Sequence, residues 1–293
     1  MDIVTHTLIG AVVVSPFALE YPLEASCFLM GSVLPDVDAL SRAFGKRTFL
    51  RAHQTVSHSL PVIGLVSLAA GLFLGPWVGL VLGLGMLSHS LLDFSNTYGI
   101  TLVWPFSWRR FCLEWVFFID VVVITTTLVV FGIIAATWSQ ARDLDLLVAS
   151  YVLTLGIYCL AKGWLRHRAA RICPVLPLSL IPSMLVPWHF LGLSRDKAQV
   201  LTFQVDAISG HVNHQEEISI LDEEYQDKLQ ELEEYRIMRQ LSSAYHVVQA
   251  ETGPEGTLVI CRDLRTRNMN TRFGQLDVLF EPIGDTRIVQ FHV

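Results

Sequence analysis

The first part of the chain concentrates residue types that bind metal ions. Histidine and aspartate occur there in four pairs: Asp2 with His6, Asp36 with Asp38, His53 with His58, and His89 with Asp93. Neutral imidazole nitrogens and carboxylate oxygens are ligands of Zn²⁺, Mn²⁺ and Fe²⁺. Two of the pairs are four residues apart, so on a helix each projects from one face, about one turn apart, and can hold a common ion. The pattern predicts a divalent metal site.

These residues divide into predicted ligands and predicted proton carriers. Either Asp2 or Asp38 could take or return the proton of a hydrolytic reaction if it is not a ligand, so both are the predicted catalytic residues. The predicted metal ligands are His6, Asp36, His53, His58, His89 and Asp93. Asp2, Asp38 and His53 could also orient the other ligands through hydrogen bonds.

The number of candidate ligands exceeds the four positions of one tetrahedral centre, which leaves room for two ions. Two cations about 3.5 to 4 Å apart would ionise a bridging water at neutral pH and would hold the attacking and leaving oxygens of a phosphoester. The predicted cofactor is therefore a divalent metal, zinc or manganese, with one ion or two.

Each residue taken alone has a simpler explanation. A single histidine is more often a hydrogen-bonded residue at a helix end than a ligand, Pro35-Asp36 could begin a turn, and His58 or Asp93 could cap a helix. Only the convergence of four motifs on one place distinguishes a metal site from a set of caps. The prediction therefore depends on how the chain is threaded.

Composition identifies the elements that must bring these motifs together. Of the 293 residues, 52% are hydrophobic and 16% charged, and the mean hydropathy is +0.47. Soluble domains carry about 25% charged residues, so a membrane protein is indicated. Residues 1–193 hold 10 acids and 11 bases, whereas residues 194–293 hold 17 acids and 10 bases. Neither part has the strongly basic character of a nucleic-acid-binding protein, and no nucleic-acid partner is expected.

Six apolar segments precede the acidic tail, at 3–19, 25–34, 60–74, 76–92, 115–138 and 144–161. Only 115–138 clearly reaches the roughly 20 residues that span a bilayer, and 25–34 is the weakest candidate. Recurrent glycines through 60–92, among them Gly71, Gly79 and Gly85, would let two helices approach closely. The sequence predicts an all-α polytopic membrane bundle of about six segments, some of them short.

Basic residues orient this bundle. If all six segments cross, the loops 39–58, 105–114 and 162–171 lie on one face of the membrane, and the other face carries Arg142 alone. The first face carries Arg42, Lys46, Arg47, Arg51, Arg109, Arg110, Lys162, Arg166, Arg168 and Arg171. By the positive-inside rule this face is cytoplasmic. All four metal motifs then lie at the cytoplasmic face of the membrane.

The chain is predicted to have three parts. Residues 1–171 form the transmembrane helical domain with the metal site, and residues 172–197, rich in proline, form a connector along the surface. Residues 198–293 form a small cytosolic α+β domain that stabilises the protein or binds an unknown protein partner. Its predicted elements are a strand at 198–205, an amphipathic helix at 216–245, and strands at 257–264, 275–281 and 286–293.

The ordered set of motifs resembles a known family. Met1-Asp2 through Thr5-His6, Pro35-Asp36-Val37-Asp38, Ser57-His58-Ser59 and His89-Ser90-Leu91-Leu92-Asp93, followed by Asn96, Gly99 and Pro105, are similar to the YdjM/YfhP-type membrane-bound metal-dependent hydrolases. The resemblance covers roughly residues 1–110. It implies a multi-span bacterial inner-membrane protein and a metal-dependent hydrolase. Where that family commonly has His-Arg, this chain has His53-Gln54, which removes a cation that could bind an anionic substrate.

A more distant similarity is to zinc-dependent phospholipase C, and it rests on His89 and Asp93 alone. The predicted function is hydrolysis of an ester or phosphoester in a lipid or lipid-linked substrate at the cytoplasmic face. Two alternatives remain open. The same residues could serve metal-ion transport or metal handling, or a metal could only staple the helices of a scaffold.

Overall fold

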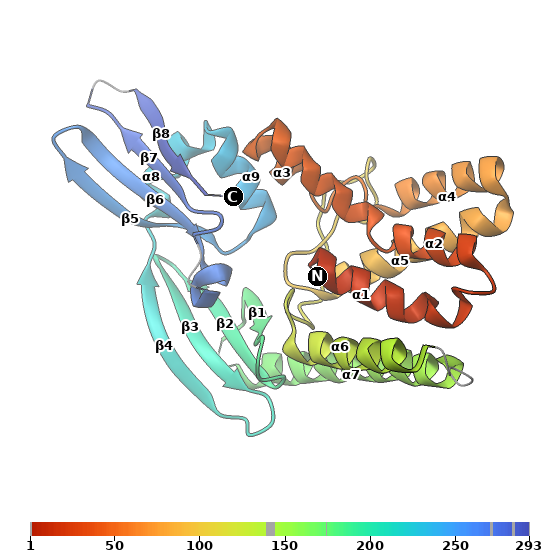
Figure 1. Ribbon diagram of the computed structural model, residues 1–293. Helices are drawn as coiled ribbons and strands as arrows, with labels where there is room; N and C mark the ends of the chain where they lie inside the picture. The colour runs from red at the N-terminus through yellow and green to blue at the C-terminus, as the bar shows by residue number, and fades with distance from the viewer. Residues whose placement is uncertain (1, 139–143, 174, 270–271, 283–284, 293) are drawn as a thin grey trace. The chain divides into compact units, whose positions relative to one another are not determined.

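The computed structural model describes residues 2–138, 144–173, 175–269, 272–282 and 285–292, without the side chains of residues 215 and 267–269. The chain forms two compact units (Figure 1). One comprises Met1–Leu165 with Pro182–Pro187, and the other comprises Arg166–Ile181 with Trp188–Val293. Arg142, which the sequence places on the less basic face, lies outside the described residues.

The first unit is helical. Its elements are α1 (Ile3–Val14) continued by the 3-10 turn η1 (Ser15–Phe17), α2 (Pro22–Gly31), the 3-10 segment η2 (Leu34–Phe44), α3 (Lys46–Ala52), α4 (Leu60–Leu74), α5 (Pro76–Ser95), α6 (Val121–Thr137) and α7 (Leu144–Ile172). Each predicted apolar segment contains a helix. Two of them, α5 and α7, are long and apolar enough to cross a membrane, while Ile3–Phe17, α4 and α6 are shorter apolar helices.

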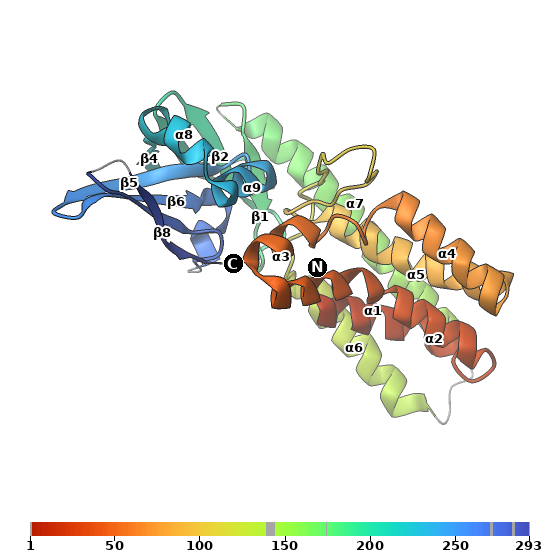
Figure 2. The same cartoon turned by 90° about the horizontal axis from the view of Figure 1, so that it is seen from above.

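Helix α5 packs against both α2 and α4, as Figure 1 and Figure 2 show. Glycines make the approach possible, because a Cβ on Gly31 would lie 2.3 Å from the carbonyl oxygen of Leu82, and one on Gly85 would lie 2.3 Å from that of Phe28. The α4 contact is closest at Gly79, where a Cβ would meet Gly71. The tight α2–α5 contact sets the distance between the end of α2 and the second half of α5.

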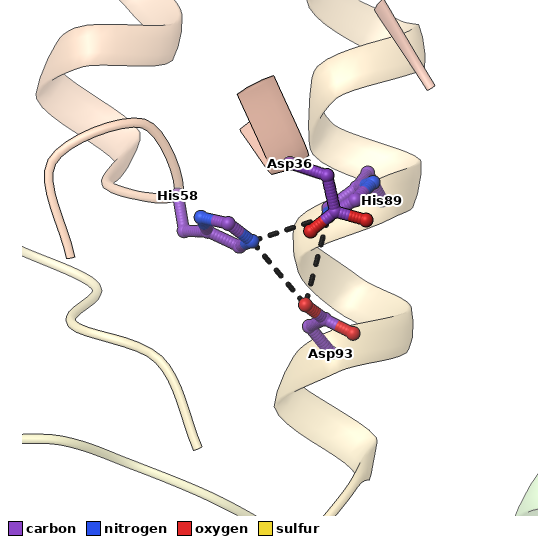
Figure 3. Close-up of side chains that lie close together, drawn as sticks. All are labelled: Asp36, His58, His89 and Asp93. Atoms are coloured by element: carbon purple, nitrogen blue, oxygen red, sulfur yellow. Dashed lines mark hydrogen bonds and ion pairs between the residues drawn. The ribbon is translucent and has the colours of Figure 1, made fainter. Parts of the chain in front are cut away.

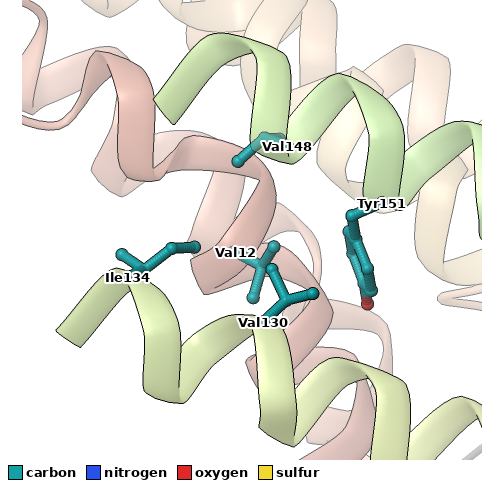
Figure 4. Packing of buried hydrophobic residues seen from close by; sticks show 5 residues of the cluster. All are labelled: Val12, Val130, Ile134, Val148 and Tyr151. Carbon is teal, nitrogen blue, oxygen red and sulfur yellow. The ribbon is translucent and has the colours of Figure 1, made fainter. Parts of the chain in front are cut away.

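A second group of helices packs through aliphatic side chains. Val12 of α1, Val130 and Ile134 of α6, and Val148 and Tyr151 of α7 form one buried cluster (Figure 4). The Tyr151 hydroxyl lies 2.8 Å from Oγ1 of Thr127, so the buried phenol has a hydrogen-bond partner. Helix α1 therefore contacts α2 on one side and the α6–α7 pair on another.

Three predicted segment boundaries need correction. The segment 115–138 becomes helical only at Val121, because the Asp120 carboxylate accepts hydrogen bonds from the amides of Val122 and Val123 and caps the helix. The preceding residues instead bond to the end of α5, through the amide of Trp115 and the carbonyl of Ser95. Helices α5 and α7 extend beyond the predicted ends at 92 and 161, since polar side chains after those points are accommodated in the helices.

The second unit contains two four-stranded sheets. The first has the order β1 (Ser179–Pro182), β2 (His189–Asp196), β3 (Gln199–Asp206), β4 (Val212–Ser219). The second has the order β5 (Tyr245–Gly253), β6 (Gly256–Asp263), β7 (Leu276–Phe280), β8 (Thr286–Phe291), with antiparallel pairing throughout. Between the sheets in sequence lie α8 (Asp222–Gln230) and α9 (Glu233–Leu241), and η4 (Leu264–Met269) follows β6.

A helical first half followed by a second part rich in strands agrees with the predicted combination, but two details were wrong. The proline-rich stretch 172–197 contains β1 and β2, because its apolar side chains, including Leu180 and Phe190, are buried in the first sheet. The single helix predicted over 216–245 is replaced by the end of β4, two short helices and the start of β5. The chain is extended at Leu232, which separates α8 from α9.

Candidate metal centre

Three segments of the helical unit meet at the centre (Figure 3). Helix α5 carries His89 and Asp93 one turn apart, and both side chains are fully buried. Asp36 comes from the start of η2, directly after the contact of α2 with α5. His58, also fully buried, comes from the loop that connects α3 to α4. The close packing of α2 on α5 thus brings residues more than fifty positions apart to one point.

The donor atoms of these side chains converge. One ligand atom from each of Asp36, His58, His89 and Asp93 lies within 4.8 Å of the others. His58 Nε2 lies 3.1 Å from His89 Nε2 and 3.2 Å from Asp93 Oδ2. His89 Nε2 lies 3.5 Å from Asp36 Oδ1 and 3.6 Å from Asp93 Oδ2. Separations of this size suit ligands on a shared cation.

The outer contacts of the two imidazoles fix which nitrogen faces inward. His89 Nδ1 lies 2.8 Å from the carbonyl oxygen of Ser32, which can only accept, so this nitrogen carries the proton and Nε2 presents its lone pair to the centre. His58 Nδ1 lies 3.0 Å from Ser57 Oγ and 3.4 Å from Asp38 Oδ2, which favours the same tautomer. In this tautomer two imidazole lone pairs and two carboxylates face one another, an arrangement that a cation between them would stabilise.

A second group of ligands shares Asp36 with the first. Ligand atoms of Asp36, Asp38 and His53 also lie within 4.8 Å of one another. Asp38 accepts hydrogen bonds from His53 Nδ1 at 2.6 Å, from the amide of Gln54 at 3.0 Å and from Ser57 Oγ at 2.6 Å. The shared carboxylate of Asp36 gives the arrangement of donors that a two-ion site would use.

The two remaining predicted residues have different surroundings. His6 is buried, its Nε2 lies 3.2 Å from Asp93 Oδ1, and its ring stacks on that of His89 with centroids 3.7 Å apart. Asp2 caps α1, since its carboxylate accepts from the amides of Val4 and Thr5 and from the Thr5 hydroxyl. His6 therefore joins the cluster beside the two ligand groups, whereas the described contacts of Asp2 are with the first turn of its own helix.

Burial and hydrogen bonding set the protonation of the groups in the loops. Burial lowers the pKa of His58 to about 4, so this imidazole is neutral at pH 7, as a metal ligand must be. Burial alone would raise the pKa of Asp36 and Asp38, but the neighbouring imidazoles, His89 beside Asp36 and His53 beside Asp38, more than offset it and hold both pKa values below the ordinary range. The two aspartates are therefore ionised and ready to bind a cation.

Three further residues complete the site. The buried Gln54 side chain reaches Asp93 Oδ2 at 3.4 Å, and Asn96 donates to Asp93 Oδ1 at 3.2 Å. Gln54 has a φ of 59°, a conformation that non-glycine residues rarely adopt. Arg110 holds this stretch through the carbonyl of His53 at 2.7 Å and the side chains of Gln54 and Thr55. Of these three residues, only Asn96 could have been connected with the site from the sequence, because it follows Asp93 by three residues.

By its fold and its site, the helical unit is a helical bundle with a buried cluster of histidine and aspartate side chains. Comparison with known families is more specific: residues 1–165 match the family model described as YdjM inner membrane protein. This match covers more than half of the 293 residues, and the chain belongs to that family. The family resemblance predicted from the motifs is thus confirmed. Comparisons with curated proteins and with solved structures give no match.

Proposed function

We propose that the protein is a membrane-bound, metal-dependent hydrolase that cleaves an ester or phosphoester in a lipid or lipid-linked substrate. The observation that carries the proposal is the convergence of Asp36, His58, His89 and Asp93, with the Nε2 atoms of the two imidazoles 3.1 Å apart. Residues that served only as helix caps would have no reason to meet in this way. The buried carboxylates also need a positive charge nearby.

Each residue of the centre has a distinct role in the proposed function. Asp36, His58, His89 and Asp93 would hold one divalent cation, and Asp36 with Asp38 and His53 would hold a second. Such cations, zinc or manganese, act as Lewis acids and lower the pKa of water. Asp38 Oδ1 accepts a hydrogen bond from His53 Nδ1 and keeps the His53 ring in one orientation.

The predicted proton carriers remain predictions. Asp38 already accepts three hydrogen bonds, which favours an orienting role over proton transfer. Asp2 is engaged as the cap of α1. His53 is the most exposed of the side chains in the second group, at 29%, so a substrate would reach the centre from its side.

A lipid substrate at the cytoplasmic face is supported by the surroundings of the centre. The family is one of inner membrane proteins, and the helices expose large apolar side chains, such as Leu72 and Phe73 on α4, which are 76% and 87% exposed. Side chains of this kind are stable when they contact lipid. The positive-inside rule orients the ends of α2 and α5 that carry the ligands toward the cytoplasm.

The test is hydrolysis by the full-length protein in detergent, loaded with Zn²⁺ or Mn²⁺ and offered phospholipids and a chromogenic phosphodiester. We expect Asp93→Asn to lower turnover by more than about a hundredfold, because it removes a ligand of the ion. Asp227→Asn, which changes an exposed carboxylate of the other unit, should have wild-type activity. A metal-loaded wild type that cleaves none of the substrates would contradict the proposal. If Asp93→Asn instead altered the metal content of growing cells, metal-ion transport would be favoured.

A further inference from the structure

The segment between the two ligand groups of the centre forms a closed loop. It leaves the centre after Asp38 and returns at His53, and the hydrogen bond of 2.6 Å between these two side chains joins its ends. The residues in between, 39–52, comprise the second part of η2 and all of α3, and these two elements pack on each other. We call residues 39–52 the basic loop.

The basic loop has an unusual charge. It contains Arg42, Lys46, Arg47 and Arg51 and no aspartate or glutamate, so its own sequence has four basic and no acidic side chains. All four of these side chains are exposed. Two large apolar side chains project beside them, Leu40 at 69% and Phe44 at 81% exposed. Cations interspersed with exposed apolar side chains are typical of segments that lie on an anionic lipid surface.

The inner side of the basic loop is attached to the centre. The ring of Phe49 stacks on that of His53 with centroids 4.8 Å apart, and the Arg42 guanidinium lies 5.9 Å from the centroid of Phe49. Leu50 is buried at 4% exposure. The loop therefore has an ordered inner side that contacts a predicted ligand and an outer side that is basic and apolar.

The ends of neighbouring helices determine where the basic loop lies. It follows helix α2, which ends at Gly31, and precedes the apolar helix α4, which begins at Leu60. In a membrane protein, the segment that leads into an apolar helix lies near the membrane surface at which that helix begins. The exposed Leu40 and Phe44 can then enter the lipid layer while the cations remain among the headgroups.

We propose that the basic loop binds the headgroups of anionic phospholipids and that the metal centre takes its substrate from this class of lipid. The second clause rests on the proposed hydrolase function, whereas the first does not. Because the loop lies between Asp38 and His53, two members of the second ligand group, a headgroup held by its cations lies beside that group.

Hydrogen–deuterium exchange of the full-length protein tests the binding. The protein is placed in nanodiscs of phosphatidylcholine or of phosphatidylglycerol, with a chelator present, and exchange is followed in peptides covering 39–52. Each cation near an anionic surface contributes about 1 kcal/mol, a factor of about five. We therefore expect exchange in these peptides to be at least about fivefold slower in phosphatidylglycerol, since binding suppresses local opening.

Matched variants test whether the cations of the basic loop cause the slower exchange in phosphatidylglycerol. Equal exchange in the two lipids is expected for the variant Arg42→Gln, Lys46→Gln, Arg47→Gln, Arg51→Gln. A control loses the same number of exposed cations from the other unit and should behave as wild type: Arg236→Gln, Arg262→Gln, Arg272→Gln, Arg287→Gln. The metal content of the loop variant should equal that of the wild type, which shows that its fold is intact.

Two results would overturn the proposal: equal exchange of the wild type in both lipids, or slower exchange in phosphatidylglycerol that persists in the loop variant. Because these measurements need neither metal nor turnover, they stand even if no hydrolysis is found. If hydrolysis is found, the wild type should cleave phosphatidylglycerol at least about fivefold faster than phosphatidylcholine, and the loop variant should lose this preference. Equal rates in the wild type would refute the substrate class alone.

Discussion

At the residue scale, the centre depends on contacts that fix each ligand from behind. His89 is held by the carbonyl of Ser32, His58 by Ser57 and Asp38, and Asp93 by Asn96. Such contacts orient the ligand atoms before any ion binds and determine the tautomer of each imidazole. They also make the protonation of the centre a source of pH dependence.

We predict that the metal-free protein loses stability as the pH falls from 7 toward 4. His58 has a pKa of about 4 in the folded protein, compared with about 6.5 when unfolded, so the unfolded chain binds more protons over this range. The full loss corresponds to about 3 kcal/mol. Because the pKa values of Asp36 and Asp38 are also lowered in the folded protein, its stability decreases further below about pH 4. Thermal unfolding in detergent with a chelator, followed from pH 7 to pH 4, measures this loss of stability.

The contribution of His58 is separated by a pair of variants. His58→Gln should show a smaller drop in melting temperature between pH 7 and pH 4.5 than the wild type, because the titrating group is gone. His211→Gln changes an exposed histidine and should keep the wild-type drop. Equal drops in all three proteins would show that His58 is not the depressed group.

The identity of most ligands could be predicted from the sequence, but their supports could not. His89 and Asp93 are four residues apart on one helix, and this spacing alone indicates a common ion. Gln54 and Arg110 have no such periodicity, because they reach the centre through a strained loop conformation and through contacts between distant segments. Asp2 has the same spacing from His6, yet the structure uses its carboxylate to cap α1.

At the element scale, the α2–α5 contact positions Asp36 relative to His89. The recurrent glycines predicted close helix packing within 60–92, and Gly71 and Gly79 do meet. Gly85, however, contacts α2 and not α4, a partner that the local glycine pattern cannot specify. The irregular stretch before α6 was missed for a related reason: its apolar residues resemble a helix, but its amides bond to the end of α5.

We predict that Gly85→Ala destabilises the protein by about 1–3 kcal/mol, because the new methyl group would lie 2.3 Å from the carbonyl oxygen of Phe28. Moving α2 away from α5 also separates Asp36 from His89, so affinity for Zn²⁺ should fall about tenfold or more. Thermal unfolding and zinc titration measure the two effects. Gly132→Ala on α6 adds a methyl group where no atom lies within 4 Å and should leave both properties unchanged. Unchanged zinc affinity in Gly85→Ala would contradict this role of the α2–α5 contact.

At the scale of the whole molecule, composition predicted a division into an apolar part and an acidic part, and the chain does form two units. The boundary was harder to predict. The second unit begins within α7, at Arg166, and β1 and β2 lie in the proline-rich stretch. Prolines made this stretch look irregular, but pairing of β2 with β3 places its apolar residues in a sheet.

Six crossings would put both termini and the centre on the cytoplasmic side. Fusions of a fluorescent protein after Arg171 and at the C-terminus should therefore fluoresce, and alkaline phosphatase fused after Gly75 should be active, because each reporter works on only one side of the membrane. Active alkaline phosphatase at the C-terminus would contradict an even number of crossings. It would also remove the basis for assigning the basic loop to the cytoplasmic leaflet.

The most direct test of the central claim is the metal content of the purified protein. After exposure to Zn²⁺ or Mn²⁺ and removal of free ions, elemental analysis should find about one to two ions per chain in the wild type. His89→Ala should retain close to none, and His211→Ala should equal the wild type. A folded wild-type protein that retains no metal, or His89→Ala that retains the full amount, would contradict the assignment of this cluster as a metal centre.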